Sequence, residues 1–388
     1  MKTKLAAITR LTILAGVITT SAALAQPFDA GSTGADGALN VTSNTTLNLP
    51  ANGIFNFTTI NVPSGFTLKF NQNALNTPVY LLATSTVAIN GTIDVSGQGG
   101  SATAGGRGGP GGFDGGFPGL DANTPPGAGY GPGGGRGGEG VFNTDSEAGG
   151  GGYATASLNT VSTNKGAAYG SALLVPLAGG SGGGGLVGSP GFGGGGGGGA
   201  IMIASNTKID VTIPGKIVAN GGGLCSGGGS GSGGAIRLVA PQVTGTGRLE
   251  ARRICNGSAG RIRIDTTNRR GVIFIADPLA SIGANMIIFP NPVPRLDVIE
   301  AAGMTIPEDT GAPVTVQLPF GSTTDRTVTV QARGFNALVP INVVLTPDSG
   351  NPVTYPTTID NQTSNPAQST INVTIPVNTV VTINAWTR

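Results

Sequence analysis

Short segments of alternating apolar residues recur along the chain, and this repeat constrains the fold more than any other feature. Four segments align from Ile54, Val79, Ala200 and Ala235, and a fifth copy begins at Arg261. The step from Ile54 to Val79 is 25 residues and that from Ala235 to Arg261 is 26. Each copy holds three short strands, and units of this size bury no apolar face alone. The pattern predicts a parallel β-helix, in which each strand pairs with its equivalents one turn away.

Two of the intervals between successive copies are longer than 25 or 26 residues, and in both the extra residues follow the third strand of a copy. The step from Val79 to Ala200 is 121 residues and the step from Ala200 to Ala235 is 35. Insertions at one corner leave the pairing of the strands uninterrupted. We therefore expect Ser96 and Ala200 to lie close together, although a Gly-rich insertion separates them.

That insertion spans residues 97–199 and contains 42 of the 70 glycines of the 388-residue chain. One interpretation is a solvated, flexible lobe with too little apolar surface to offset its ordering entropy. The other is a lobe anchored by Phe and Tyr side chains, with glycine and proline stretches packed closely as polyproline-II-like segments. The anchoring candidates are Phe113, Phe117, Tyr130, Phe142 and Tyr153.

The predicted fold is all-β, with a right-handed parallel β-helix of about five or six turns followed by a small immunoglobulin-like β-sandwich. The β-helix covers residues 26–96 and 200–288 on either side of the insertion. A Pro-rich linker and cap follows at 289–306, and Val/Thr/Ile alternation between turn signals places the sandwich at 307–388.

The first 25 residues have the pattern of a secretory signal peptide, with three cations before an apolar run that ends in Ala-Leu-Ala. After its removal 18 Lys and Arg face 19 Asp and Glu, so charge gives no reason to expect nucleic acid as a partner. No later run is apolar enough to cross a bilayer. We expect a protein exported through the periplasm and secreted, or held at the surface of a Gram-negative bacterium.

The chain contains no histidine, which excludes a Ser-His-Asp triad, a Cys-His dyad and His-based zinc sites. Its glycine-rich matches to nucleophile-elbow and dinucleotide motifs follow from composition. We expect no catalytic residues, no metal and no cofactor.

An arginine-rich region is the candidate binding site. If Ile236, Ile262 and Ile264 point inward, the arginines that alternate with them point outward, and Arg237 stacks on Arg263 one turn away. Guanidinium groups suit the carboxylates and sulfates of an anionic polysaccharide. The alternative is a solvated outer face with acidic counter-charges. The candidate residues are Arg237, Arg261, Arg263, Arg252 and Arg253.

The two cysteines fall in Gly-bearing corners of adjacent predicted turns. When Ile217 is aligned with Leu249, Cys225 and Cys255 follow eight and six residues later. Adjacent turns are separated by about one strand spacing, which a disulfide tolerates. We predict a Cys225–Cys255 disulfide.

The sequence resembles a group of uncharacterised secreted Gly-rich proteins of Gram-negative bacteria, whose repeats are similar to those of β-helical adhesins of the filamentous-haemagglutinin type. The segments "GTIDVSGQGG", "YGSALLVPLAGGSGGGG" and "GSGGAIRLVAPQVTGTGRLEA" carry the resemblance, which covers roughly residues 36–270. It implies a surface or extracellular location. We expect a non-enzymatic structural or adhesive protein that contacts a surface polysaccharide or another extracellular protein; the alternative is a β-helical polysaccharide-binding protein or a lyase acting on an anionic glycan.

Overall fold

The computed structural model describes residues 27–388 except 122–123, 139–147, 160–161, 189–190 and 224–227. Strands dominate this part of the chain, and its helical content is a 3₁₀ turn at Ser162–Asn164. The expected all-β class is confirmed. The predicted signal peptide at residues 1–25 lies outside the described residues.

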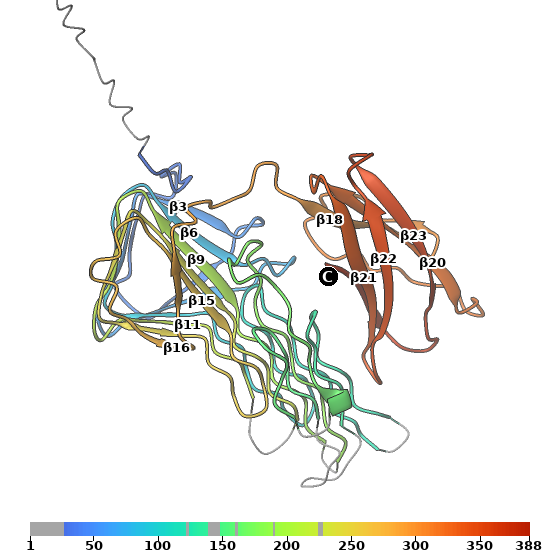
Figure 1. Ribbon diagram of the computed structural model, residues 1–388. Helices are drawn as coiled ribbons and strands as arrows, with labels where there is room; N and C mark the ends of the chain where they lie inside the picture. Colours follow the sequence, from blue (N-terminus) through green and yellow to red (C-terminus); the bar gives the residue numbers. More distant parts are fainter. Residues whose placement is uncertain (1–26, 122–123, 139–147, 160–161, 189–190, 224–227) are drawn as a thin grey trace, which may run out of the picture.

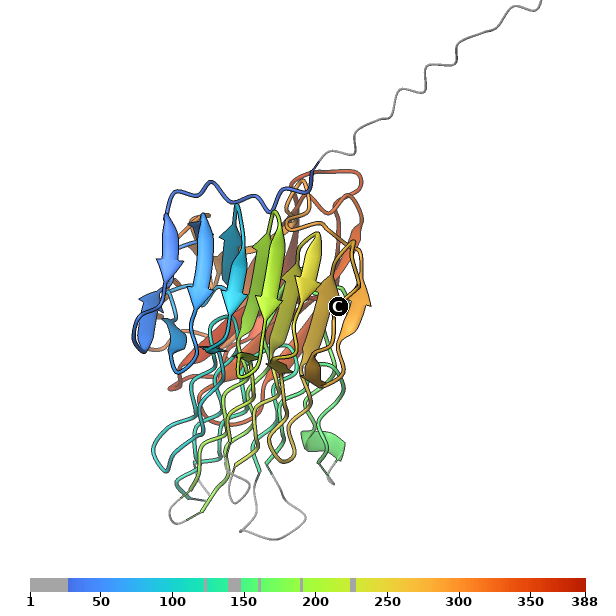
Figure 2. The same cartoon turned by 90° about the vertical axis from the view of Figure 1, so that its left-hand side faces the viewer.

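Three parallel sheets build the first part of the molecule, and the chain visits them in rotation (Figures 1 and 2). Sheet A contains β1 (Ala38–Asn40), β4 (Thr59–Val62), β7 (Val87–Ile89), β10 (Lys208–Val211) and β13 (Gln242–Thr244). Sheet B contains β2 (Thr45–Asn48), β5 (Thr67–Asn71), β8 (Thr92–Asp94), β11 (Lys216–Val218), β14 (Arg248–Glu250) and β16 (Ile275–Asp277). Sheet C contains β3 (Ile54–Phe57), β6 (Val79–Ala83), β9 (Ala200–Ser205), β12 (Ala235–Val239), β15 (Arg261–Asp265) and β17 (Ser281–Gly283). This order is the one a parallel β-helix requires.

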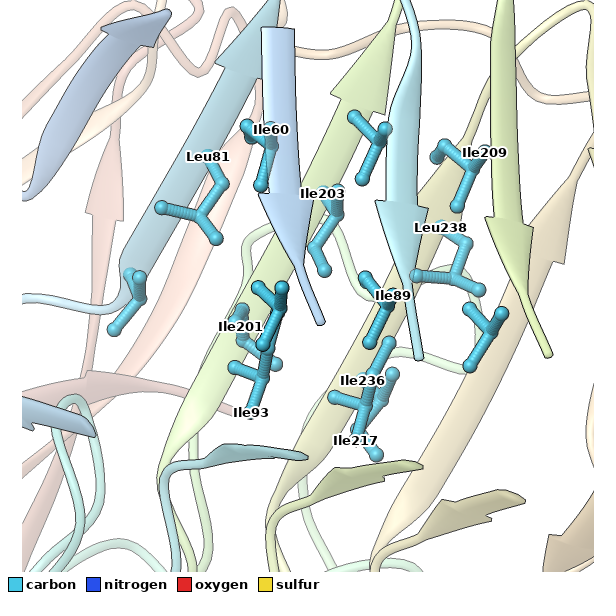
Figure 3. Packing of buried hydrophobic residues seen from close by; sticks show 14 of the residues in the cluster. Ile60, Leu81, Ile89, Ile93, Ile201, Ile203, Ile209, Ile217, Ile236 and Leu238 are labelled. Carbon is cyan, nitrogen blue, oxygen red and sulfur yellow. The ribbon is translucent and has the colours of Figure 1, made fainter. Parts of the chain in front are cut away.

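The core lies between the three sheets and consists of the inward residue of each alternating pair (Figure 3). Successive side chains of a strand point to opposite faces, so an apolar residue at every second position supplies one continuous core along the stack. The sheets contribute Ile60, Ile89 and Ile209; Ile93 and Ile217; and Leu81, Ile201, Ile203, Ile236 and Leu238.

Strand register agrees with the sequence alignment in the later copies and differs by one residue at the two earlier steps. Ala200 pairs with Ala235 and Ala235 with Arg261, as expected. Ile54, however, pairs with Tyr80 and not with Val79, and Val79 pairs with Ile201 and not with Ala200. A shift of one residue moves every side chain to the other face. Alternation could not resolve it because Ile54 and Phe55 are both apolar, and Ile54 packs on the outer face of sheet C.

Seven consecutive glycines, Gly193–Gly199, run through the centre of the Gly-rich lobe. Their N–H groups donate hydrogen bonds to three neighbouring segments in a repeating order. Those of Gly193, Gly196 and Gly199 donate to the carbonyls of Ser101, Gln98 and Val95. The N–H groups of Gly194 and Gly197 donate to carbonyls in the segment 113–116. Those of Gly195 and Gly198 donate to carbonyls in the segment 229–232. A period of three residues is that of polyproline II, here with its backbone groups satisfied by neighbouring segments.

Side chains are excluded from this bundle. A Cβ atom on any of the seven glycines would lie within 3.0 Å of a neighbouring backbone carbonyl oxygen. A second segment, 179–185, runs antiparallel to the first, because Gly180 donates to Gly198 and Gly183 to Gly195. The described part of the insertion therefore follows the closely packed alternative. The glycines are required because backbone segments can approach this closely only where no Cβ atom lies between them.

The insertion leaves and rejoins the β-helix at one corner, as expected from the repeat. The N–H of Gly199 donates to the carbonyl of Val95 at 2.7 Å, although 103 residues of insertion begin at position 97. Strand β9 then continues sheet C directly beside β6.

Two antiparallel sheets form the C-terminal part. One contains β18 (Arg295–Ala301), β19 (Met304–Thr305), β20 (Asp325–Arg333) and β23 (Ala367–Thr374), and the other contains β21 (Leu338–Pro347), β22 (Val353–Asp360) and β24 (Val381–Thr387). Val328, Val330, Val343 and Leu345 belong to one buried cluster shared by both sheets. Strand β18 lies inside the predicted linker 289–306, so that boundary was wrong: "RLDVIEA" pairs with β20 despite the Pro-rich segment before it.

The C-terminal part contacts the Gly-rich lobe through the turn after β21. Tyr130 donates its hydroxyl hydrogen to Asp348 at 3.0 Å, and Ser349 donates to the carbonyl of Pro125 at 2.7 Å. The ring of Phe113 meets Trp386 of β24 edge to face, 5.2 Å between centroids. Two of the aromatic anchors expected in the insertion, Tyr130 and Phe113, therefore contact the C-terminal part, whereas Phe142 lies outside the described residues.

Candidate functional site

Arg237 and Arg263 are paired neighbours on β12 and β15, as the alignment predicted. Arg237 also points away from the apolar core, but it is 0% exposed, so the expectation that it faces solvent is wrong. The physical reason is a second layer on the outside of sheet C, which contains Tyr153 and Leu174 of the insertion together with Met286 and Ile288 of the segment after β17. Asn285 of that same segment accepts a hydrogen bond from Arg237. Strand alternation specifies the face of a side chain and not what covers that face.

Asp265 neutralises these arginines beneath the cover. Its carboxylate accepts hydrogen bonds from Arg237 Nε at 3.2 Å and from Arg263 Nη2 at 2.7 Å, and also from the N–H of Asn285 at 2.9 Å. Arg237 Nη2 donates to the carbonyl of Asn285 at 2.8 Å. Burial lowers the pKa of Arg237, and the charge of Asp265 opposes that effect. The cluster therefore fastens the chain after β17 to sheet C, and it is not an open binding surface.

Arg261 also serves the internal structure. Its guanidinium lies 5.3 Å from the centroid of the Tyr153 ring, and Nη2 donates to the carbonyl of Tyr169 at 3.0 Å. The rings of Tyr153 and Tyr169 pack in a tilted arrangement with centroids 4.9 Å apart, and burial raises the pKa of both phenols. Arg261, the first residue of β15, therefore joins the insertion to sheet C.

Arg252 and Arg253 lie at a corner pocket of about 440 Å³. Arg252 bridges Glu250, at 3.3 Å, and Asp277, at 2.9 Å. Arg253 is exposed and makes no hydrogen bond or ion pair within the described part of the chain. The five predicted residues are thus not one strip: Arg261 contacts the insertion, and Arg237 and Arg263 are bound to Asp265. The other two line this pocket with Thr155, Leu158, Ser258, Ala259 and Asp277.

A second pocket, of about 450 Å³, lies on the outer face of sheet B and was not predicted. Its outward row runs in register through Thr67, Thr92, Lys216 and Arg248 across β5, β8, β11 and β14. The side chains one position later in each strand are buried in the core. The rest of the lining consists of Gly65, Phe66, Asn90, Gly91, Pro214 and Glu250. The signal was in the sequence, because aligning Ile217 with Leu249 also aligns Lys216 with Arg248.

The sheet B face carries both signs of charge. Lys69 and Asp94, which are paired residues of β5 and β8, form an ion pair at 3.4 Å. Arg248 lies 3.9 Å from Glu250, a carboxylate that Arg252 approaches more closely. Lys216 has no polar partner for its ammonium group among the described residues. This face, and not the arginines of sheet C, offers cations to an external ligand.

The remaining sequence predictions have separate outcomes. Cys255 lies in the turn after β14 with a φ of 41°, while Cys225 lies outside the described residues, so their disulfide stays a prediction. No group of three His, Cys, Asp or Glu side chains suitable for a metal occurs in the described ranges. No helix in those ranges has the length and apolar character needed to span a membrane.

No family model, no curated protein and no solved structure matches this chain.

Proposed function

We propose that this is a non-enzymatic structural or adhesive protein, secreted or held at the surface of a Gram-negative bacterium. In this proposal a right-handed parallel β-helix of about five or six turns supports the Gly-rich lobe, and the C-terminal part is an immunoglobulin-like sandwich. Export rests on the signal-peptide pattern of residues 1–25.

The observation that carries this proposal is the backbone-bonded lobe. Its interior segments use glycine at most positions and place few reactive side chains there, so what they provide is a rigid support. The support presents apolar side chains to solvent, including Phe117 at 40% and Leu120 at 69% exposure. Exposed apolar residues on a rigid extension suit contact with another surface better than they suit catalysis.

The test is attachment of the purified protein to intact cells of the producing bacterium. We expect the variant F117S/L120S to be retained less than the unaltered protein, because the substitutions remove the exposed apolar contacts of the lobe. The matched control is V377S/V380S, which removes two exposed valines of the C-terminal part. Equal retention of all three proteins would contradict an adhesive lobe.

A β-helical polysaccharide-binding protein is the second candidate, and the two pockets beside sheet B favour it. The lyase form of this alternative has less support, since Asp94 lies on sheet B and Asp210 on sheet A, whereas Arg237 is completely buried on sheet C. Incubation with calcium and a polyuronate separates the two forms. A lyase would generate ultraviolet absorbance from unsaturated product, whereas a binding protein would not.

A further inference from the structure

Two cations stand side by side on the outer wall of sheet B. Lys216 has no ion-pair partner among the described residues, and Arg248 has Glu250 at 3.9 Å. Lys216 and Arg248 are paired residues of adjacent parallel strands, and both point outward because Ile217 and Leu249 are buried in the core. Adjacent strands lie about 4.8 Å apart, and like charges directly opposite each other are destabilising.

A like-charged pair on the same sheet shows how the chain handles this problem elsewhere. Glu250 and Asp277 are paired residues of β14 and β16, and the guanidinium of Arg252 lies between them, 3.3 Å and 2.9 Å away. No described carboxylate bridges Lys216 and Arg248 in the same way. Glu250 is 3.9 Å from Arg248 and is shared with Arg252.

The two cations open onto the pocket of about 450 Å³, which is large enough for one or two sugar rings. Lys216, Arg248 and Glu250 give its lining one net positive charge. Phe66 supplies an apolar aromatic surface, and Asn90 with the two threonines supplies hydrogen-bonding groups. A ligand that fits these features has one negative charge, several hydroxyls and one apolar face.

We propose that this pocket binds a sugar unit that carries a monoanionic group, either a carboxylate or a sulfate ester. The anionic group lies between Lys216 and Arg248, and the apolar face of the ring lies against Phe66. The ammonium and guanidinium groups form charge-assisted hydrogen bonds with its oxygens. The inference deepens the polysaccharide-binding alternative given above, to which it assigns a site and a ligand class.

Calorimetric titration with three oligosaccharides of matched length tests the proposal. We expect binding of an oligogalacturonate or of a sulfated dextran fragment, and no binding of neutral dextran; the two charged probes distinguish a carboxylate from a sulfate. Affinity for the bound probe falls as salt is raised, because an exposed ion pair is screened. Binding of neutral dextran as tightly as the charged probes would overturn the proposal.

Charge-neutral variants locate the site. We expect K216Q/R248Q to bind at least tenfold more weakly, and the single variant R248Q to lose part of that affinity. The control R269Q/R270Q removes the same charge from two exposed arginines outside the pocket and should bind within twofold of the unaltered protein. Equal losses in the variant and the control would show a general charge effect and overturn the assignment. So would a loss confined to R253Q, which would place the ligand in the corner pocket.

The adhesion test is independent of this result. F117S/L120S leaves Lys216, Arg248 and Phe66 unchanged, so it should bind the charged probe normally even where attachment to cells is reduced. Failure of the sugar to bind would therefore remove this pocket assignment and leave the structural or adhesive proposal standing.

Discussion

At the scale of single residues, the buried carboxylate of Asp265 determines what the arginines of sheet C do. It is completely buried and paired with Arg237, also completely buried, and with Arg263, whose side chain is 13% exposed. A buried ion pair is weak evidence of net stabilisation, but removal of one partner leaves an uncompensated charge. The sequence alone shows arginines that alternate with isoleucines, a pattern that indicates a strand with one solvated face.

We predict that Asp265→Asn lowers the free energy of unfolding by about 3–5 kcal/mol, because it leaves two guanidinium groups without their counter-charge. Arg237→Met should cost less, since Asp265 keeps Arg263 and an apolar side chain suits the surrounding layer. Urea denaturation measures both. Asp210→Asn is the control: its ion pair with Lys208 is partly exposed, so we expect a loss below about 1 kcal/mol. A D265N protein as stable as D210N would contradict this account.

The buried phenols predict how stability changes in alkaline solution. Burial raises the pKa of Tyr80 to about 12 and raises those of Tyr153 and Tyr169 above the ordinary value near 10. The unfolded chain therefore loses these protons first, so stability is complete below pH 10 and falls as pH rises from 10 towards 12. Each phenol contributes up to about 1.4 kcal/mol per pH unit in that window. Urea midpoints between pH 9 and 11.5 should show this fall, and a smaller one in Tyr80→Phe; midpoints that stay level would contradict it.

At the scale of elements, the glycine segments of the lobe are as specific as the strands. Gly197 has no left-handed φ, so its constraint is space: its Cβ position meets the carbonyl of Gly180. We predict that Gly197→Ala destabilises the protein by about 1–3 kcal/mol or more, as expected for overpacking. Gly311→Ala is the matched control, because nothing lies within 4 Å of its Cβ position. Equal melting temperatures for the two variants would show that the glycine segments of the lobe can accommodate a methyl group without loss of stability.

The repeat made most elements predictable, and the limits have physical causes. Pairing of β12 with β15 followed from alternation because only one face of that segment is aliphatic throughout. Pairing of β3 with β6 followed too, but its register was wrong by one residue, because both faces of sheet C are covered at Ile54 and Phe55. The close packing of glycine segments remained one of two interpretations, since composition does not reveal which backbones meet. Likewise, the pocket at Lys216 was not predicted. It depends on the register of Lys216 with Arg248 and on the turns that carry Phe66 and Asn90, and the strand pattern alone does not place those turns.

At the scale of the whole molecule, the lobe connects the other two parts. Tyr153 and Leu174 cover the outer face of sheet C, and Tyr130 and Phe113 hold the C-terminal sheets. An insertion that merely left the β-helix and returned would not make these contacts. The lobe is therefore part of the outer apolar layer of sheet C and also contacts the C-terminal sheets.

Replacement of residues 97–199 by a short Gly/Asn linker tests that role. The linker can close the corner, because Gly199 already bonds to Val95, and the alternation that sets the strand register is retained. The deletion nevertheless removes Tyr153, Leu174 and Leu177 from the apolar layer that contains Met202, and each buried apolar side chain lost from this layer costs about 1.5–3 kcal/mol. We predict a β-rich protein by circular dichroism that melts at a lower temperature and binds an apolar dye. Adding M202S and V239T to the deletion should reduce dye binding, since both side chains belong to the uncovered layer. A deletion variant with the melting temperature of the intact protein and no dye binding would show that the lobe stabilises nothing beyond itself.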